Sequence, residues 1–101
     1  MSGQLHAVQH TTSAGTVAVV AAPGAGYRIT VVGFHVSEGS AGVVTLGFSA
    51  GNQKVWNMAA NQNIDVGLTR WEGDANTALS LTSPATGPTD VEVDYVLELA
   101  P

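Results

Sequence analysis

The sequence predicts an all-β protein: a single antiparallel β-sandwich or jelly roll of about eight short strands. Apolar and polar residues alternate in short runs, most regularly in Asp90–Leu99. This alternation is typical of a strand with one face on a core and the other in solvent. Glycine, proline or small polar residues end each run, at the spacing of about 8–12 residues expected between the turns of a sandwich. No stretch of the sequence shows the spacing of apolar residues that is typical of a helix.

The N-terminal residues differ from the rest of the chain. Residues 4–13 mix apolar and polar side chains, which predicts an edge strand or an extended arm. We therefore expect an N-terminal arm or edge strand in residues 1–15 and a β-sandwich domain in residues 16–101. The domain begins with a nearly all-apolar strand over residues 16–22, and Pro23 ends it because proline fixes φ.

Residues 27–37 predict a long strand with two faces. A glycine in the middle of a strand indicates a bulge or a close approach by another backbone, and Gly33 stands at such a position. One face is expected to carry Arg28, Thr30, Val32, Phe34 and Val36, and the other Ile29, Val31, Gly33 and His35.

Further strands are expected after a turn at residues 38–42. Their ranges are residues 43–50, 53–60, 64–68, 77–83 and 90–99, with a polar loop at 70–76 and a turn at 84–89. Residues 53–60 could form a helical turn, but the length of the segment favours a strand. The side chains expected to point inward from three of these strands are Val44, Leu46, Phe48, Leu79, Leu81, Val91, Val93, Tyr95, Leu97 and Leu99.

The composition indicates that part of the surface is covered by protein. Of the 101 residues, 45% are apolar and 11% are charged, against about 25% charged in an ordinary soluble domain. A small domain has a large surface, and few charges are available to cover it. We expect self-association or burial by a partner. The alternative is a monomer with a surface of Ser, Thr, Asn and Gln.

The charge argues against nucleic acid and membrane partners. The net charge is −5, and the only cations are Arg28, Lys54 and Arg70, whereas phosphate binding needs clustered Lys and Arg. No apolar run approaches the roughly 20 residues of a membrane span. The first six residues lack the basic and apolar segments of a secretion signal. The chain has no cysteine, which fits synthesis in a reducing cytoplasm.

From Ala21 onward, the order of several short motifs resembles a family of small tailed-bacteriophage virion proteins. The motifs are Ala22–Ile29, Ser49-Ala50-Gly51, Ala59-Ala60-Asn61, Trp71-Glu72-Gly73, Ala78–Leu81 and Val91–Tyr95. The family comprises capsid decoration and head-fibre proteins with a jelly-roll fold. The resemblance implies a homotrimer on a capsid or fibre, located in the virion, and it carries no catalytic motif.

No metal or other cofactor is expected. His6 and His10 would share a strand face about 13 Å apart (four residues at about 3.3 Å), too far for one ion, although a threefold axis could gather copies of one histidine. The other candidates for metal ligands are His35 and the carboxylates Glu72, Asp74, Asp90, Glu92 and Asp94. Calcium needs several oxygen ligands around it, and carboxylates on a flat strand do not close around an ion, so a solvated face is expected.

No enzymatic activity is expected. The sequence has no Gly-x-Ser-x-Gly motif, no cysteine nucleophile and no phosphate-binding glycine loop. Glycoside hydrolysis needs two carboxyl groups across a cleft, and a small sandwich with few carboxylates and no clustered aromatic residues is a poor host for one.

The alternative function is a carbohydrate-binding, lectin-like module with a glycan as partner. Trp71 lies among Arg70, Glu72 and Asp74, where an exposed indole would stack on a sugar ring beside hydrogen-bonding groups. Trp56 is flanked by apolar residues, which favours the core or an interface. Structural packing is the favoured role for both tryptophans.

These observations predict a non-enzymatic structural protein of a phage particle. We expect a capsid decoration protein that forms homotrimers and binds the major capsid protein or other virion proteins. The residues expected at interfaces are Leu5, His6, Val8, His10, Val17, Val19, Trp56 and Trp71.

Overall fold

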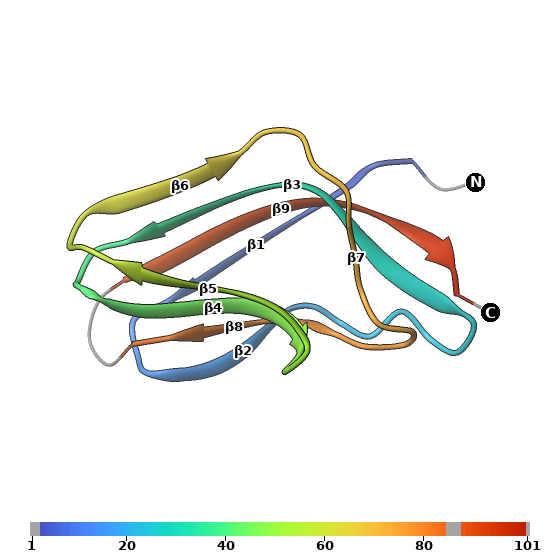
Figure 1. The fold of residues 1–101 in the computed structure, drawn as a ribbon, viewed down its shortest axis with the longest axis horizontal. Helices are drawn as coiled ribbons and strands as arrows, with labels where there is room; N and C mark the ends of the chain where they lie inside the picture. Colours follow the sequence, from blue (N-terminus) through green and yellow to red (C-terminus); the bar gives the residue numbers. More distant parts are fainter. Residues whose placement is uncertain (1–2, 85–87, 101) are drawn as a thin grey trace.

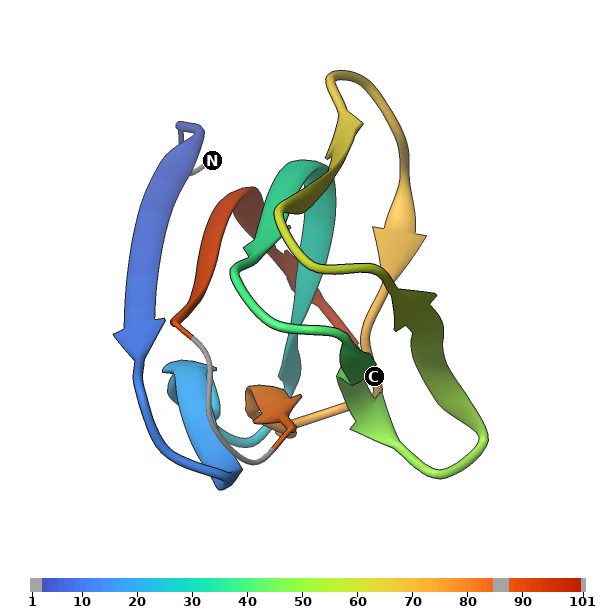
Figure 2. The same ribbon diagram turned by 90° about the vertical axis from the view of Figure 1, so that its left-hand side faces the viewer.

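The chain folds into two antiparallel β-sheets that pack face to face (Figures 1 and 2). The computed structural model describes residues 3–84 and 88–100. These residues form nine strands and no helix, so they include no helix long and apolar enough to cross a membrane. The predicted all-β sandwich is confirmed. Of the turn predicted at residues 84–89, residues 85–87 lie outside the described part.

The first sheet, sheet A, has five strands in which the last strand of the chain is central. Its order is β1 (Leu5–Thr11), β9 (Thr89–Leu99), β3 (Tyr27–Glu38) and β6 (Gln62–Val66), and the short β7 (Trp71–Glu72) also pairs with β3. The residues predicted as an arm or edge strand therefore form edge strand β1. The final strand β9 is not at an edge, because its residues 89–95 pair with β1 and its whole length pairs with β3.

The second sheet, sheet B, has four strands. Its order is β2 (Gly15–Val20), β8 (Leu79–Ser83), β4 (Gly42–Ser49) and β5 (Asn52–Met58). The segment that could have formed a helical turn is thus strand β5. In Figure 1, these strands lie along the lower side of the molecule.

The core lies between the sheets and matches most of the predicted inward positions. The predicted side chains that are buried there are Val44, Leu46, Phe48, Leu79, Leu81, Val91 and Val93. Tyr95 and Leu97 pack against this cluster and are partly buried. The prediction for Leu99 is wrong: it is 70% exposed, because it ends β9 opposite Tyr27, which is itself exposed at the end of the sheet.

A bulge in β3 changes which side chains face the core. The pairing of β3 with β9 shifts between Val31 and Gly33, and an extra residue in one strand reverses the alternation beyond it. Ile29 and Val31 are buried before the bulge, and Phe34 and Val36 are buried after it. The two faces predicted for this strand are therefore wrong.

Both explanations considered for Gly33 are confirmed. Besides marking the bulge, its backbone approaches the loop after β6, so that a Cβ atom there would lie 3.1 Å from the carbonyl oxygen of Gly67.

Candidate interaction surfaces

Charged residues are distributed unequally between the two sheets. Lys54 is the only charged residue in the four strands of sheet B. Its ammonium group does not mark the outer face, because Nζ lies 4.9 Å from the centre of the Trp71 ring. The strands of sheet A contain Arg28, Glu38, Asp65, Glu72, Asp90, Glu92, Asp94 and Glu98. The sandwich therefore has one charged and one uncharged outer face.

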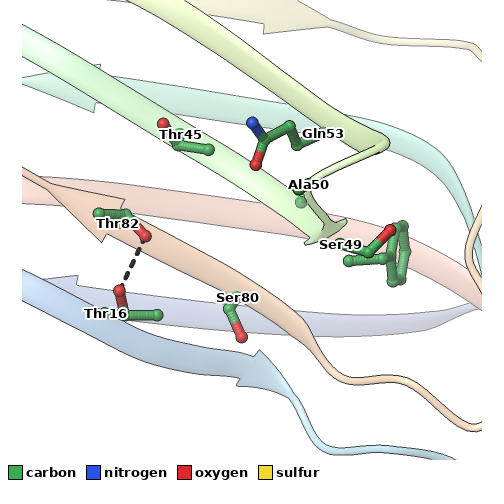
Figure 3. Close-up of a pocket in the computed structure, with 9 residues that line it drawn as sticks. Thr16, Thr45, Ser49, Ala50, Gln53, Ser80 and Thr82 are labelled. Carbon is green, nitrogen blue, oxygen red and sulfur yellow. Dashed lines mark hydrogen bonds between the residues drawn. The ribbon is translucent and has the colours of Figure 1, made fainter.

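The outer face of sheet B, here called the neutral face, consists of small polar and apolar side chains. One cross-strand row runs Thr16, Thr82, Thr45, Val55, and the next runs Ala18, Ser80, Gly47, Gln53. The hydroxyl groups of Thr16 and Thr82 form a hydrogen bond with 2.9 Å between the oxygens, and a dashed line marks this bond in Figure 3. Val43 and Val55, on β4 and β5, are 49% and 54% exposed.

A hollow of about 320 Å³ lies on the neutral face. The strands β2, β8, β4 and β5 contribute uncharged side chains to its lining, among them Thr16, Ser80 and Gln53 (Figure 3). Gly47 also lines the hollow and packs closely on β5, because a Cβ atom there would collide with the side chain of Gln53. The neutral face is therefore hollowed and uncharged, a combination that suits contact with another protein surface.

The outer face of sheet A, here called the paired face, carries acidic side chains that are exposed but have basic partners. Nδ1 of His6 lies 2.7 Å from a carboxylate oxygen of Asp94, and Nε2 lies 3.6 Å from Glu92. His10 forms a close pair with Asp90. The sequence predicted a solvated acidic face here, and the structure shows that the same carboxylates form cross-strand pairs.

The third histidine is also on the paired face. His35 Nδ1 lies 3.9 Å from Asp65, and its register partner on the other side is Glu92. His6, His35 and their acidic partners line a second hollow of about 200 Å³. The structure therefore brings the three histidines to one face. Among the described residues, however, no three histidine or acidic side chains lie where they could hold a metal ion.

Hydrogen bonding raises the pKa of His6. The main cause is the bond to Asp94, and the negative charges of Asp94 and Glu92 add to it, whereas desolvation opposes it.

Two arginines contact the acidic residues Glu98, near the end of β9, and Glu72 on β7. Arg70 donates to both carboxylate oxygens of Glu98, at 3.0 and 2.8 Å, and to Glu72 at 2.8 Å. Arg28 reaches Glu72 at 3.3 Å. The bonds from Arg70, then from Thr30, lower the pKa of Glu98 to about 2. All three cations of the chain therefore have partners within the fold, since Lys54 lies over the Trp71 ring.

Trp71 lies in the core. Its side chain is 9% exposed, its ring centre lies 5.2 Å from that of Phe48, and Nε1 donates to Asn52 at 2.8 Å. The predicted loop around Trp71 contains strand β7, which pairs with β3. The exposed indole required by the sugar-binding hypothesis is absent at Trp71, and this part of the prediction is wrong.

The other residues predicted at interfaces fall into two groups. Val17, Val19 and Trp56 pack partly against the core, and the Trp56 ring centre lies 5.8 Å from that of Phe34. Leu5 and Val8 are 40% and 59% exposed on edge strand β1, where His6 and His10 are also exposed.

Sequence reasoning did not select Val43 and Val55 as contact residues. The sequence shows that both valines lie in alternating strands. It does not show which strands are their neighbours, and therefore it does not show that their surroundings are uncharged.

Comparison with known proteins finds a likeness of fold to a solved structure. No protein-family model matches the chain, and no curated protein sequence matches it. Among solved structures, it is similar to a chain of the structure titled "Cyanophage Pam1 capsid asymmetric unit", with a TM-score of 0.50 and 18% sequence identity. The match covers 91% of this chain and 83% of the other. At this identity, the likeness concerns the fold.

Proposed function

We propose that the chain is a non-enzymatic structural protein of a phage particle. The observation that carries the proposal is the fold shared, over 91% of the chain, with a chain of a cyanophage capsid structure. The order of sequence motifs supports the narrower proposal of a capsid decoration protein that assembles as a homotrimer. Its location would then be the virion, where it binds the major capsid protein or other virion proteins.

The neutral face is the surface proposed for these contacts. Removing a charged group from water is costly, whereas hydroxyl, amide and small apolar groups are buried at much lower cost. Each copy has a net charge of −5, so copies that meet through sheet B keep their acidic groups apart. Val43 and Val55 supply exposed apolar area beside the hollow.

The charged groups support a structural role. Carboxylates and histidines are the usual groups for acid–base catalysis. Here Asp90, Asp94 and Glu98 are held by basic side chains on the surface of a sheet. These contacts brace neighbouring strands.

A matched pair of substitutions tests the contact surface. Val55→Lys places a charge on the neutral face, and Val8→Lys places the same charge on the paired face. Both residues are valines on edge strands, with exposures of 54% and 59%. Native mass spectrometry and sedimentation velocity at micromolar concentration should find an oligomer for the wild type and Val8→Lys, and dissociation for Val55→Lys.

Purified virions test the wider role. The protein should be present in particles of the phage that encodes it, and Val55→Lys should reduce its amount there. A monomeric wild type that is also absent from particles would overturn the structural role. Equal behaviour of the two lysine variants would overturn the assignment of the neutral face.

A further inference from the structure

Each of the three histidines stands directly opposite an aspartate on a neighbouring strand. The register pairs His6 with Asp94 and His10 with Asp90, between β1 and β9. It likewise pairs His35 with Asp65, between β3 and β6. Side chains directly opposite in an antiparallel pair are the closest neighbours across a sheet. The His–Asp pairing is thus repeated at all three histidines.

These pairs join the outer strands of sheet A to its two central strands. The sheet order is β1-β9-β3-β6, so two pairs hold β1 on β9 and one holds β6 on β3. Edge strands have unpaired backbone groups on one side and are the strands at which another chain can pair.

The charge of the paired face depends on the histidines. The charged groups that face them are Asp90, Glu92 and Asp94 on β9 and Asp65 on β6. Arg28 and Arg70 contact Glu72 and Glu98 instead. Histidine gains its charge between about pH 8 and pH 5, a range in which arginine and carboxylate groups normally keep theirs.

We propose that the cross-strand pair of His6 and Asp94 forms a pH-sensitive latch, which holds the edge strand β1 on the central strand β9 below neutral pH and weakens above it. Above neutral pH, the His6 imidazole loses its charge, and β1 is held by the backbone ladder and by packing. The latch rests on the cross-strand geometry and does not depend on a role in a virion.

The direction of the effect follows from proton linkage. The pKa of His6 is raised in the folded protein, so its contribution is fully present below the unfolded value and is lost as the pH rises through the folded value.

Amide hydrogen exchange on the full chain at about pH 5.5 and about pH 8, corrected for the intrinsic rate, tests the latch. Protection of β1 amides should be greater at the lower pH, by about two- to fivefold. Amides of β4 and β8 are the internal reference, since sheet B contains no histidine.

Two double variants separate the latch from other effects of pH. His6→Gln with His10→Gln should remove the pH dependence at β1 and leave low protection. His6→Lys with His10→Lys should remove it and leave high protection, because lysine stays charged throughout this range.

A second measurement is an NMR titration of the His6 imidazole, which gives its pKa in the wild type and in Asp94→Asn. Asp94→Asn should lower its pKa. Equal corrected protection of β1 at both pH values, or unchanged pH dependence in the glutamine variant, would overturn the proposal.

Discussion

Replacing Trp71 with alanine should destabilise the fold strongly. The indole is buried between Phe48 and Phe34, with ring centres 5.2 and 6.2 Å away. It also donates a hydrogen bond to Asn52 and lies beneath the ammonium group of Lys54. The substitution removes all of these contacts and leaves a cavity at the point where β7 meets the core.

The expected loss is about 3–5 kcal/mol, the usual range for removing a buried tryptophan or phenylalanine side chain. A domain of this size has a free energy of unfolding of about 5–15 kcal/mol, so the variant should be only marginally folded. Since each kcal/mol corresponds to about 4–8 °C in a domain of 60–100 residues, the melting temperature should fall by at least about 12 °C.

Urea unfolding followed by far-UV circular dichroism measures this loss without depending on tryptophan fluorescence. Trp71→Phe keeps a ring against Phe48 and loses the bond to Asn52, so it should cost about 1–2 kcal/mol. Leu68→Ala is the surface control, since Leu68 is 90% exposed, and it should stay within about 0.5 kcal/mol of the wild type. A Trp71→Ala variant as stable as this control would refute the reasoning, because the indole would then contribute little to the core.

Two further substitutions test local packing and the arginine cluster. Gly73→Ala should cost about 1–3 kcal/mol in urea unfolding, because a Cβ atom there would lie 2.5 Å from the Phe48 ring and 2.8 Å from a backbone oxygen; Gly51→Ala, which meets open space, is the control, and equal stabilities would contradict the prediction. Arg70→Gln should raise the pKa of Glu98 from about 2, as measured by carboxyl NMR titration. Because that pKa is depressed in the folded state, the difference in stability between the wild type and Arg70→Gln should be present above about pH 4.5 and shrink as the pH falls towards 2. A difference that stays constant across this range would contradict the role of Arg70.

Alternation along the chain predicted the strands that have one simple inward face. In β4 and β8, every predicted inward residue is buried, because side chains in an uninterrupted strand point alternately to opposite faces. The same rule failed in β3, where the bulge at Gly33 reverses the faces. The glycine indicated that a bulge was possible, but its effect on the register depends on the partner strand β9.

The candidate surfaces were less predictable than the strands. His6, His10 and the acidic residues of β9 were recognised as exposed strand residues, yet His6 and Asp94 are separated by 88 positions in the sequence. Their pairing depends on which strands are neighbours and in what register, and local alternation does not contain this information. For the same reason, the burial of Trp71 could not be derived from the polar residues around it.

By itself, the sequence determined the all-β class, the positions of most strands and the scarcity of charge, since these depend on local patterning and on composition. Only the tertiary structure decided that β9 lies between β1 and β3, that the acidic row meets histidines and arginines, and that sheet B is left with an uncharged outer face. The physical reason is that alternation fixes the faces of each strand separately. The order in which strands pair then determines which faces combine into a surface.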